Sequence, residues 1–400
     1  MMTAAAEAVD RVWRADSASM LGVLARRLGS LDRAEEALQD ALAEALKHWT
    51  DEGVPANPAG WLVTTAWRKA LDAARRTSTG EQKLAQLAAE PTPQPGDDDR
   101  LALIFACCHP ALTQPAQVAL TLHAASGLAT EEIAAAFLVP SRTMAQRLVR
   151  AKRQLRERGV RFDPLTPDEF DERLPAVLAV VYLVFNEGYL ASGRVAPQRR
   201  ELAREGLDLA RQLAGLMPHE PEAGGLAALI ELHEARAAAR FDGWGRLVLL
   251  ENQDRSRWDR ELIANAVARL GRAVARNRPG PYQVQAGIAA QHALAPDFEA
   301  TDWAAIRHLY DLLYDLQPSP VVLLNRAVAT RHTHGAAQAL AEVDELAPSL
   351  DEYRLLHATR AELLRALGRE DGARQATERA LALATNPAER DLLAGRLGAV

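Results

Sequence analysis

Hydrophobic residues recur along most of this chain every three to four positions, which is the spacing of one face of an α-helix. The segment 31–46 is the clearest case, because acidic and amide residues fill the positions between its apolar ones. Its apolar positions are Leu31, Ala34, Leu38, Leu42, Ala45 and Leu46. Segments of similar character fill residues 10–77, 100–158 and the chain from about 163 onward. The pattern therefore predicts an all-α fold.

Polar residues and prolines mark where several of these helices begin. Asn57 precedes a proline, which is the usual order of an N-cap and a first helical position, so a helix is predicted over 58–76. Thr130, followed by two glutamates, marks a second start, and Ser141 after Pro140 marks a third.

A proline-rich segment divides the helical segments into domains. Residues 78–99 contain three prolines and an acidic run, which is typical of a flexible linker. The linker separates a helical domain over 10–77 from a second one over 100–160. A helical extension is then expected over 165–400.

The C-terminal end of this extension contains an internal sequence repeat. Two short helices and a closing proline are predicted over 356–393, and residues 321–349 form a weaker copy about one repeat earlier. The small residues of the first copy are Ala361, Gly368, Ala373 and Ala380. Small residues at such spacing resemble tetratricopeptide (TPR) packing, so the extension is expected to be TPR-like.

Composition and targeting signals narrow the class of protein. The chain has 400 residues, 48% hydrophobic and 25% charged, which is enough for two or three domains. It contains no apolar run long enough for a membrane span, and its first residues do not read as a secretory signal. The two cysteines, Cys107 and Cys108, are adjacent and cannot frame a disulfide scaffold. We therefore expect a cytoplasmic protein.

Charge is distributed unevenly along the chain. Residues 1–161 carry 20 Lys and Arg against 19 Asp and Glu, a net charge of +1, whereas residues 162–400 carry 27 against 34, a net charge of −7. Within residues 140–161, eight basic residues face one acid, Glu157, which gives a local net charge of +7. Such a concentration of positive charge is typical of a surface that binds a polyanion.

The basic segment has the layout of a helix-turn-helix. A short helix with Ile133, Ala134 and Phe137 inside is followed by a turn and by an arginine-rich helix that begins at Ser141. We expect the core face of this second helix to hold Met144, Leu148 and Val149. The residues expected to face base edges and phosphates are Arg142, Thr143, Gln146, Arg147 and Arg150. The alternative is a solvated basic helix that binds nothing.

Two further clusters invite a chemical interpretation. Cys107, Cys108 and His109 are consecutive on one helix and cannot close a tetrahedral metal site, so packing is the expected role and no metal or cofactor is predicted. At the end of an apolar helix lie Asn186, Glu187, Gly188 and Tyr189, which either form a site for a small ligand or partner or simply end the helix.

The segments described above, taken in order, carry a family resemblance. They read LDRAEEALQDALAEALKHW, NPAGWLVTTAWRKALDAARR, FACCHPALTQPAQVALTL and EEIAAAFLVPSRTMAQRLVRAKRQLR. These resemble regions 2 and 4 of an extracytoplasmic-function (ECF) RNA polymerase sigma factor of the sigma-70 superfamily, with the linker in place of region 3. The Cys-Cys-His-Pro sequence at 107–110 and the tract at 180–192 resemble a subgroup with a C-terminal TPR-like extension.

The resemblance implies roles for particular residues. The acidic helix would dock on core RNA polymerase through Asp32, Glu35, Glu36, Gln39 and Asp40. The loop 50–57 and the helix after it would read and melt the −10 promoter element. The candidates for that contact are Asn57, Trp61, Arg68, Lys69, Arg75 and Arg76. The basic helix, with Ser141 at its start, would read the −35 element.

The expected function is therefore promoter-specific transcription initiation, with no catalytic residue. We also expect the acidic extension to regulate the protein in cis, through a protein partner or small ligand or by docking near the basic helix. Two alternatives remain. In the first alternative, the chain is a TPR-type scaffold without promoter recognition. In the second, it is an enzyme that uses Asn186 and Glu187.

Overall fold

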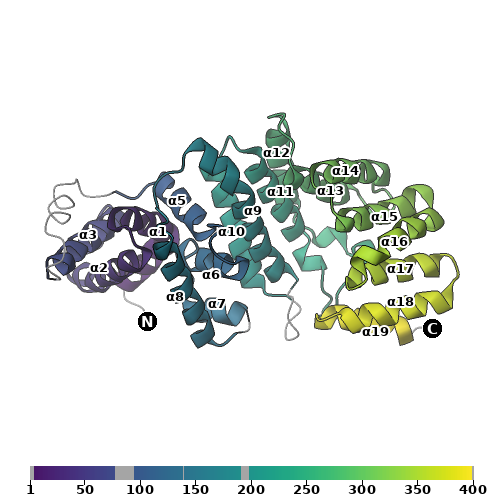
Figure 1. The fold of residues 1–400 in the computed structure, drawn as a ribbon, viewed down its shortest axis with the longest axis horizontal. Helices are drawn as coiled ribbons and strands as arrows, with labels where there is room; N and C mark the ends of the chain where they lie inside the picture. Colours follow the sequence, from purple (N-terminus) through teal and green to yellow (C-terminus); the bar gives the residue numbers. More distant parts are fainter. Residues whose placement is uncertain (1–3, 77–93, 138, 191–197, 399–400) are drawn as a thin grey trace. The chain divides into compact units, whose positions relative to one another are not determined.

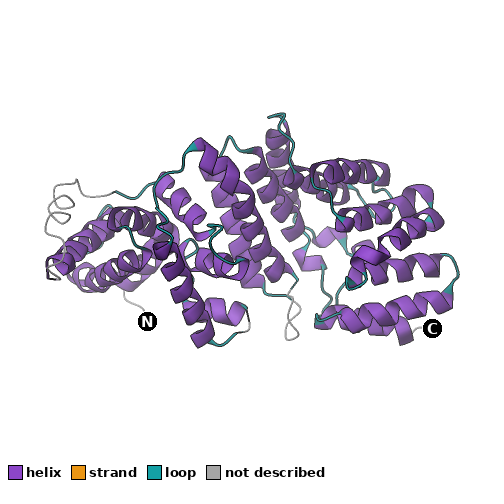
Figure 2. Ribbon diagram, in the orientation of Figure 1, coloured by secondary structure: helices purple, strands orange, loops and turns teal. Residues whose placement is uncertain are grey.

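The structure, a computed structural model, describes residues 4–76, 94–137, 139–190 and 198–398. Every regular element in these ranges longer than an isolated bridge is a helix (Figure 2). The all-α prediction is confirmed. Most of the predicted linker 78–99 lies outside the described residues, which resume at Gln94. No helix in the described part combines the length and apolar character needed to cross a bilayer.

The chain divides into two compact units, residues 1–183 and 184–400. The division falls inside one helix, α9 (Pro167–Tyr189). Residues 165–183, which the sequence assigned to the extension, therefore belong to the first unit.

The first unit begins with three helices that pack against one another (Figure 1). They are α1 (Ala4–Leu28), α2 (Leu31–Asp51) and α3 (Pro58–Arg76). The Ser30 hydroxyl caps α2 by accepting from the Arg33 N–H, and Asn57 caps α3 as predicted, because its Oδ1 accepts from the Gly60 N–H at 2.9 Å. Leu38 and Leu62 are fully buried, whereas Leu46 is 44% exposed and does not belong to the core side of α2.

Four further helices complete the second predicted domain. They are α5 (Asp97–Cys107), α6 (Gln114–Ala124), α7 (Thr130–Ala136) and α8 (Ser141–Glu157). Helix α5 packs against both α1 and α6, and α8 packs against α6 and α7. The first part of α9 belongs to this group, because the Phe170 ring stacks on Phe105 at 5.2 Å and Arg173 donates to the Phe105 carbonyl.

The second unit is a succession of helices, each packed against the next along the chain. They are α10 (Arg200–Leu216), α11 (Pro221–Glu234), α12 (Arg260–Val274), α13 (Pro281–Leu294), α14 (Trp303–Leu316), α15 (Pro320–His334), α16 (Ala336–Leu350), α17 (Arg354–Ala366), α18 (Glu370–Leu383) and α19 (Pro387–Gly398). Three short 3₁₀ turns, η1 (Ala237–Ala239), η2 (Leu250–Asn252) and η3 (Arg255–Arg257), lie between α11 and α12.

The predicted repeat corresponds to consecutive helix pairs in this succession. Helices α15 and α17 begin 34 residues apart, at Pro320 and Arg354, which is the length of a tetratricopeptide repeat. One apolar cluster runs through α15 to α18 and includes Val343, Leu356 and Ala373. The TPR-like expectation is confirmed for this part of the chain.

Helices α9 and α10 cross so closely that glycine is required at the crossing. A Cβ added to Gly206 of α10 would lie 2.6 Å from the Phe185 backbone nitrogen. A Cβ on Gly188 of α9 would overlap the backbone of Ala203. Two helices approach this closely only where a side chain is missing.

A partly buried histidine lies beside this crossing. His233 of α11 lies against the rings of Phe185 and Tyr189, with centroids 6.3 and 5.5 Å away. Burial, reinforced by the guanidinium groups of Arg236 and Arg240, lowers the pKa of His233 to about 3. The folded unit therefore holds this imidazole neutral.

The helix crossing predicts opposite effects for two alanine substitutions in α10. Gly206→Ala should destabilise the protein by about 1–3 kcal/mol, because the new methyl group forces the two backbones apart. Gly215→Ala should be neutral or stabilise by about 0.5–1 kcal/mol, since nothing lies within 4 Å of its Cβ position. Thermal unfolding followed by circular dichroism measures both. Equal melting temperatures would contradict the close crossing.

Acidification should weaken the second unit between about pH 6.5 and pH 4. The unfolded chain binds a proton at His233 in this interval and the folded chain does not, so stability falls as pH falls, by up to about 1.4 kcal/mol per pH unit. Urea midpoints at pH 7, 6 and 5 measure the slope. His233→Gln should reduce the slope without abolishing it, because burial also lowers the pKa of His292 to about 4, whereas His308→Gln, at an exposed position of α14, should leave the slope unchanged. An identical slope in both variants would show that His233 titrates normally in the folded state.

Candidate nucleic-acid interface

Helices α7 and α8 form the predicted helix-turn-helix, and local hydrogen bonds fix both starts. The Glu132 carboxylate accepts from the Ala129 N–H at 2.7 Å and so caps α7. Pro140 precedes α8, and its carbonyl accepts from the Thr143 and Met144 N–H groups. The turn chemistry of the sequence thus sets where the basic helix begins.

One side of α8 is buried, and it differs in part from the prediction. Met144 and Leu148 are buried as expected, and Ala151 and Leu155 continue their stripe toward the end of the helix. Val149 was predicted to be in the core, but it is 61% exposed. It follows Leu148 directly and therefore points about 100° away from the buried stripe.

The predicted DNA-facing residues lie on the solvent side of α8. Ser141, Arg142, Thr143, Gln146 and Arg150 are exposed, and Arg147 is half-buried. No ion pair within the described residues holds the guanidinium groups of the three arginines. Val149, which the sequence analysis assigned to the core, lies among these residues as an exposed apolar position. Its spacing of seven residues from Arg142, two helical turns, was the signal that it belongs on this side of the helix.

The predicted polymerase-facing residues of α2 are in two different environments. Glu36, Gln39 and Asp40 are exposed. Asp32 and Glu35 instead form ion pairs with Lys152 of α8. The Lys152 ammonium lies 2.6 Å from the Glu35 Oε2 and 3.3 Å from the Asp32 Oδ1.

The predicted −10 residues lie on α3 and its N-cap. Arg68 is exposed, whereas the Lys69 ammonium pairs with the Glu44 carboxylate of α2 at 3.1 Å. Trp61 is half-buried with its ring edge-on to Trp49, with centroids 5.6 Å apart. Asn57 is engaged as the helix cap. The side chains of Arg75 and Arg76 lie outside the described part of the structure.

The tract that ends α9 is built into the second unit. The Arg199 guanidinium pairs with Glu187, and the Arg236 guanidinium donates to the Tyr189 hydroxyl at 2.9 Å. Arg240 lies over the Tyr189 ring, 3.5 Å from its centroid, and also donates to the Tyr189 carbonyl. Gly188 permits the close approach of α10 described above. Three of the four predicted regulatory residues therefore have packing or pairing roles.

The two cysteines are buried thiols. Cys107 and Cys108 are both inaccessible to solvent, and burial raises the pKa of Cys108 to about 12. The Cys108 sulfur lies 3.5 Å from the Thr121 hydroxyl oxygen. Among the described residues, no group of three or more His, Cys, Asp or Glu is arranged to hold a metal ion.

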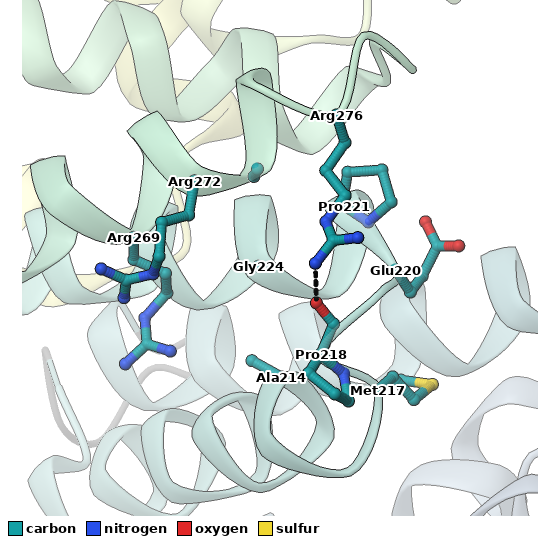
Figure 3. A pocket seen from close by; sticks show the side chains of 10 residues that line it. Ala214, Met217, Pro218, Glu220, Pro221, Gly224, Arg269, Arg272 and Arg276 are labelled. Atoms are coloured by element: carbon teal, nitrogen blue, oxygen red, sulfur yellow. Dashed lines mark hydrogen bonds between the residues drawn. The ribbon is translucent and has the colours of Figure 1, made fainter.

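A cavity of about 280 Å³ lies beside α11 and α12 of the second unit (Figure 3). Its basic wall is formed by Arg269, Arg272 and Arg276. Arg269 is paired with the buried Glu231, and Arg276 donates to the Pro218 carbonyl at 3.1 Å. Arg272 and Arg276 are solvent-exposed, so the cavity has no deeply buried charge with which to hold a ligand.

Comparison with known proteins identifies the two helical groups of the first unit. Residues 13–79 match Sigma-70 region 2, and residues 102–155 match Sigma-70, region 4. Residues 173–274 match a family of unknown function (DUF6596). An uncharacterized protein of Rhizobium meliloti (strain 1021) is 45% identical over 383 residues, which cover 92% of this chain and 90% of the relative.

No solved structure matches the chain. The matches to regions 2 and 4 fall on α1–α3 and on α5–α8, which are the two groups of helices that the sequence predicted as separate sigma domains. The chain therefore belongs to the ECF-type sigma factors of the sigma-70 family, with a C-terminal helical extension.

Proposed function

We propose that this sigma factor binds core RNA polymerase through α2, reads the −10 element through α3 and reads the −35 element through α8. One observation carries the proposal: α8 buries a single apolar stripe and presents its arginines to solvent. Sigma-70 regions 2 and 4 support promoter recognition by the family; the residues assigned to each contact are our proposal.

The solvent side of α8 has the chemistry needed to read duplex DNA in the major groove. Arg142, Arg147 and Arg150 can each donate two hydrogen bonds to guanine or pair with phosphate, and Gln146 can pair with adenine. Val149 adds an apolar contact suited to the methyl group of thymine. The helix thus combines charge for affinity with base-specific groups for sequence preference.

Helix α3 is proposed to act on the −10 element. Trp61 has part of its ring accessible, and Arg68 is exposed on the same helix. An aromatic ring and a cation on one helix suit an unstacked base and its backbone phosphate. Lys69 would have to leave Glu44 before it could join them.

The exposed acidic side of α2 is proposed to dock on core polymerase. Glu36, Gln39 and Asp40 are available in the structure as it stands. Since polymerase and promoter DNA lie in the cytoplasm, we propose that the protein acts there. Sigma factors are not enzymes, and we propose neither a catalytic residue nor a cofactor.

The helical extension is proposed to regulate the factor in cis. The support is electrostatic, because residues 162–400 carry a net charge of −7 and the basic segment 140–161 a net charge of +7. A partner or ligand of the extension would change how strongly it competes with DNA.

Charge reversal on α8 tests promoter reading. Arg147→Glu together with Arg150→Glu should abolish start-site selection by reconstituted holoenzyme, because both residues would repel DNA. In vitro transcription on genomic fragments measures the loss. The matched control reverses Arg369 and Arg374, which are exposed arginines at the start of α18.

The control should initiate normally, and core polymerase should still capture the α8 variant in a pull-down. Accurate initiation by a folded α8 variant would overturn the proposed role of this helix. Val149→Ser should weaken the preference for one base pair without changing the salt dependence of binding, because it removes no charge.

Removal of the extension tests regulation in cis. A chain that ends at Tyr189 keeps the Phe170 and Arg173 contacts with α5. If the extension competes with DNA, this chain should bind promoter duplex more tightly at low salt, and the difference should shrink as salt rises. Fluorescence anisotropy measures the affinity and circular dichroism checks the fold. Equal affinity of the two chains at every salt concentration would exclude the competition.

A further inference from the structure

Three arginines in the segment that joins α11 to α12 carry buried charge without a carboxylate to neutralise it. Arg240 is 7% exposed, Arg255 is 8% exposed, and Arg236 is half-buried. Within the described residues, none of the three forms an ion pair with an Asp or Glu side chain. Arginine is rarely buried unless it is paired, because an unpaired charge loses its hydration without compensation. We call these three residues the arginine cluster.

Two members of the arginine cluster meet at Tyr189, the last residue of α9. The Arg236 guanidinium donates to the Tyr189 hydroxyl at 2.9 Å. The Arg240 guanidinium lies over the Tyr189 ring, 3.5 Å from its centroid, and donates to the Tyr189 carbonyl. Both cations therefore lie close to one ring, and the groups that they bond there are neutral.

The third member, Arg255, also bonds to neutral groups. Its Nη1 donates to the carbonyls of His292 and Ala295 at the end of α13, at 2.5 and 2.8 Å. Its guanidinium carbon lies 4.6 Å from the centroid of the Trp258 ring. Burial lowers the pKa of Arg255 and of Arg240, but a guanidinium stays protonated at neutral pH. The cluster thus keeps its positive charge in the folded protein.

The packing of α11 on α13 explains why these groups lie together. At the start of α11, the Glu222 carboxylate accepts from the Tyr282 and Gln283 N–H groups at the start of α13. The two helices pack on each other and so run in the same direction. Their last turns therefore lie side by side, and these turns carry His233 and His292.

The arginines surround this pair of histidines. Arg236 precedes η1 and Arg255 begins η3, and these two turns pack on each other. Burial and the guanidinium groups of Arg236 and Arg255 lower the pKa of His292 to about 4. Arg236 and Arg240 act in the same way on His233, as described above. Both imidazoles are thus neutral at pH 7, and each can donate one hydrogen bond.

Several buried polar atoms near the cluster have no hydrogen-bond partner among the described residues, and most of them are nitrogens. The nitrogens are Nε of Arg236, Nη2 of Arg255, Nε1 of Trp258 and Nδ1 of His292, and the oxygen is Oε1 of Gln253. Buried donors are almost always satisfied in folded proteins, so an excess of free donors is matched by a ligand that only accepts. Carboxylates and phosphates are such acceptors, and they pair with a guanidinium through two hydrogen bonds.

We propose that the arginine cluster binds an oxyanion, the carboxylate or phosphate group of a small ligand. The ligand supplies the negative charge that the surrounding side chains do not. Tyr189, Arg236 and His292 are each half-buried, so a small anion can approach them from solvent. All three arginines lie in the stretch that matches a family of unknown function. The site belongs to the second unit and does not depend on the promoter contacts proposed above.

Thermal unfolding of the full chain tests the site with two simple oxyanions. Sodium phosphate and sodium acetate are compared with sodium chloride at one pH and one ionic strength, and circular dichroism follows the transition. A ligand that binds only the folded state stabilises it by mass action. The melting temperature should therefore rise and then saturate with at least one of the two oxyanions. The anion that saturates at the lower concentration indicates a phosphate or a carboxylate ligand.

The shape of the titration separates binding from the general effect of salt. Phosphate and acetate also stabilise proteins because they are excluded from the surface, and that effect increases steadily without saturation. A saturating rise beyond the chloride reference supports the site. A steady rise alone, or none with either anion, would overturn it.

Two matched substitutions locate the binding. Arg236→Gln should weaken the apparent affinity for the oxyanion on the order of 10-fold, because it removes a charged donor. Arg272→Gln removes the same charge from an exposed position of α12, at the cavity described above, and should bind as the wild type does. Equal affinity in Arg236→Gln and wild type would overturn the site. An equal loss in both variants would show that the anion responds only to net charge, which also overturns it.

Arg236→Lys keeps the proposal testable if Arg236→Gln does not fold. Lysine retains the charge but cannot make two parallel hydrogen bonds, so the affinity should fall by less than in Arg236→Gln and still measurably. Circular dichroism at 20 °C checks that each variant is folded. Affinity unchanged in a folded Arg236→Lys would contradict recognition by the guanidinium.

Discussion

The division of the α8 surface is the constraint on which the rest of the first unit depends. Met144, Leu148, Ala151 and Leu155 must be buried together, and this fixes the rotation of the helix on α6 and α7. Once the rotation is fixed, Lys152 faces α2 and the arginines near Ser141 face solvent. The buried stripe thus leaves Lys152, in the C-terminal half of α8, paired with α2, and leaves the side chains of its N-terminal half open to DNA.

The ion pair between Glu35 of α2 and Lys152 of α8 matters for stability because it is shielded from water. An exposed ion pair contributes little to stability. The Glu35 carboxylate and the Lys152 ammonium are mostly buried, so neither can be left alone cheaply.

The extension is organised around close backbone contact and buried charge at its beginning. Gly188 and Gly206 let α9 and α10 touch, and Glu231, 1% exposed, is held by the guanidinium groups of Arg211 and Arg269. These residues lie in the stretch that matches a family of unknown function. The later helices pair in the manner of tetratricopeptide repeats and depend mainly on small apolar residues such as Ala361 and Ala373.

Local rules in the sequence determined the helices, their starts at Asn57 and Ser141, and the all-α class, because caps and apolar spacing act over a few residues. Tertiary structure decided which neighbour each face meets. Periodicity placed Val149 next to the core, but the direction of α8 on its neighbours turned it to solvent. The pairing of Lys152 with Glu35 joins residues 117 positions apart, and no local pattern encodes such a contact. It exists only because the packing of α1 on α5 brings two separately predicted helical groups together.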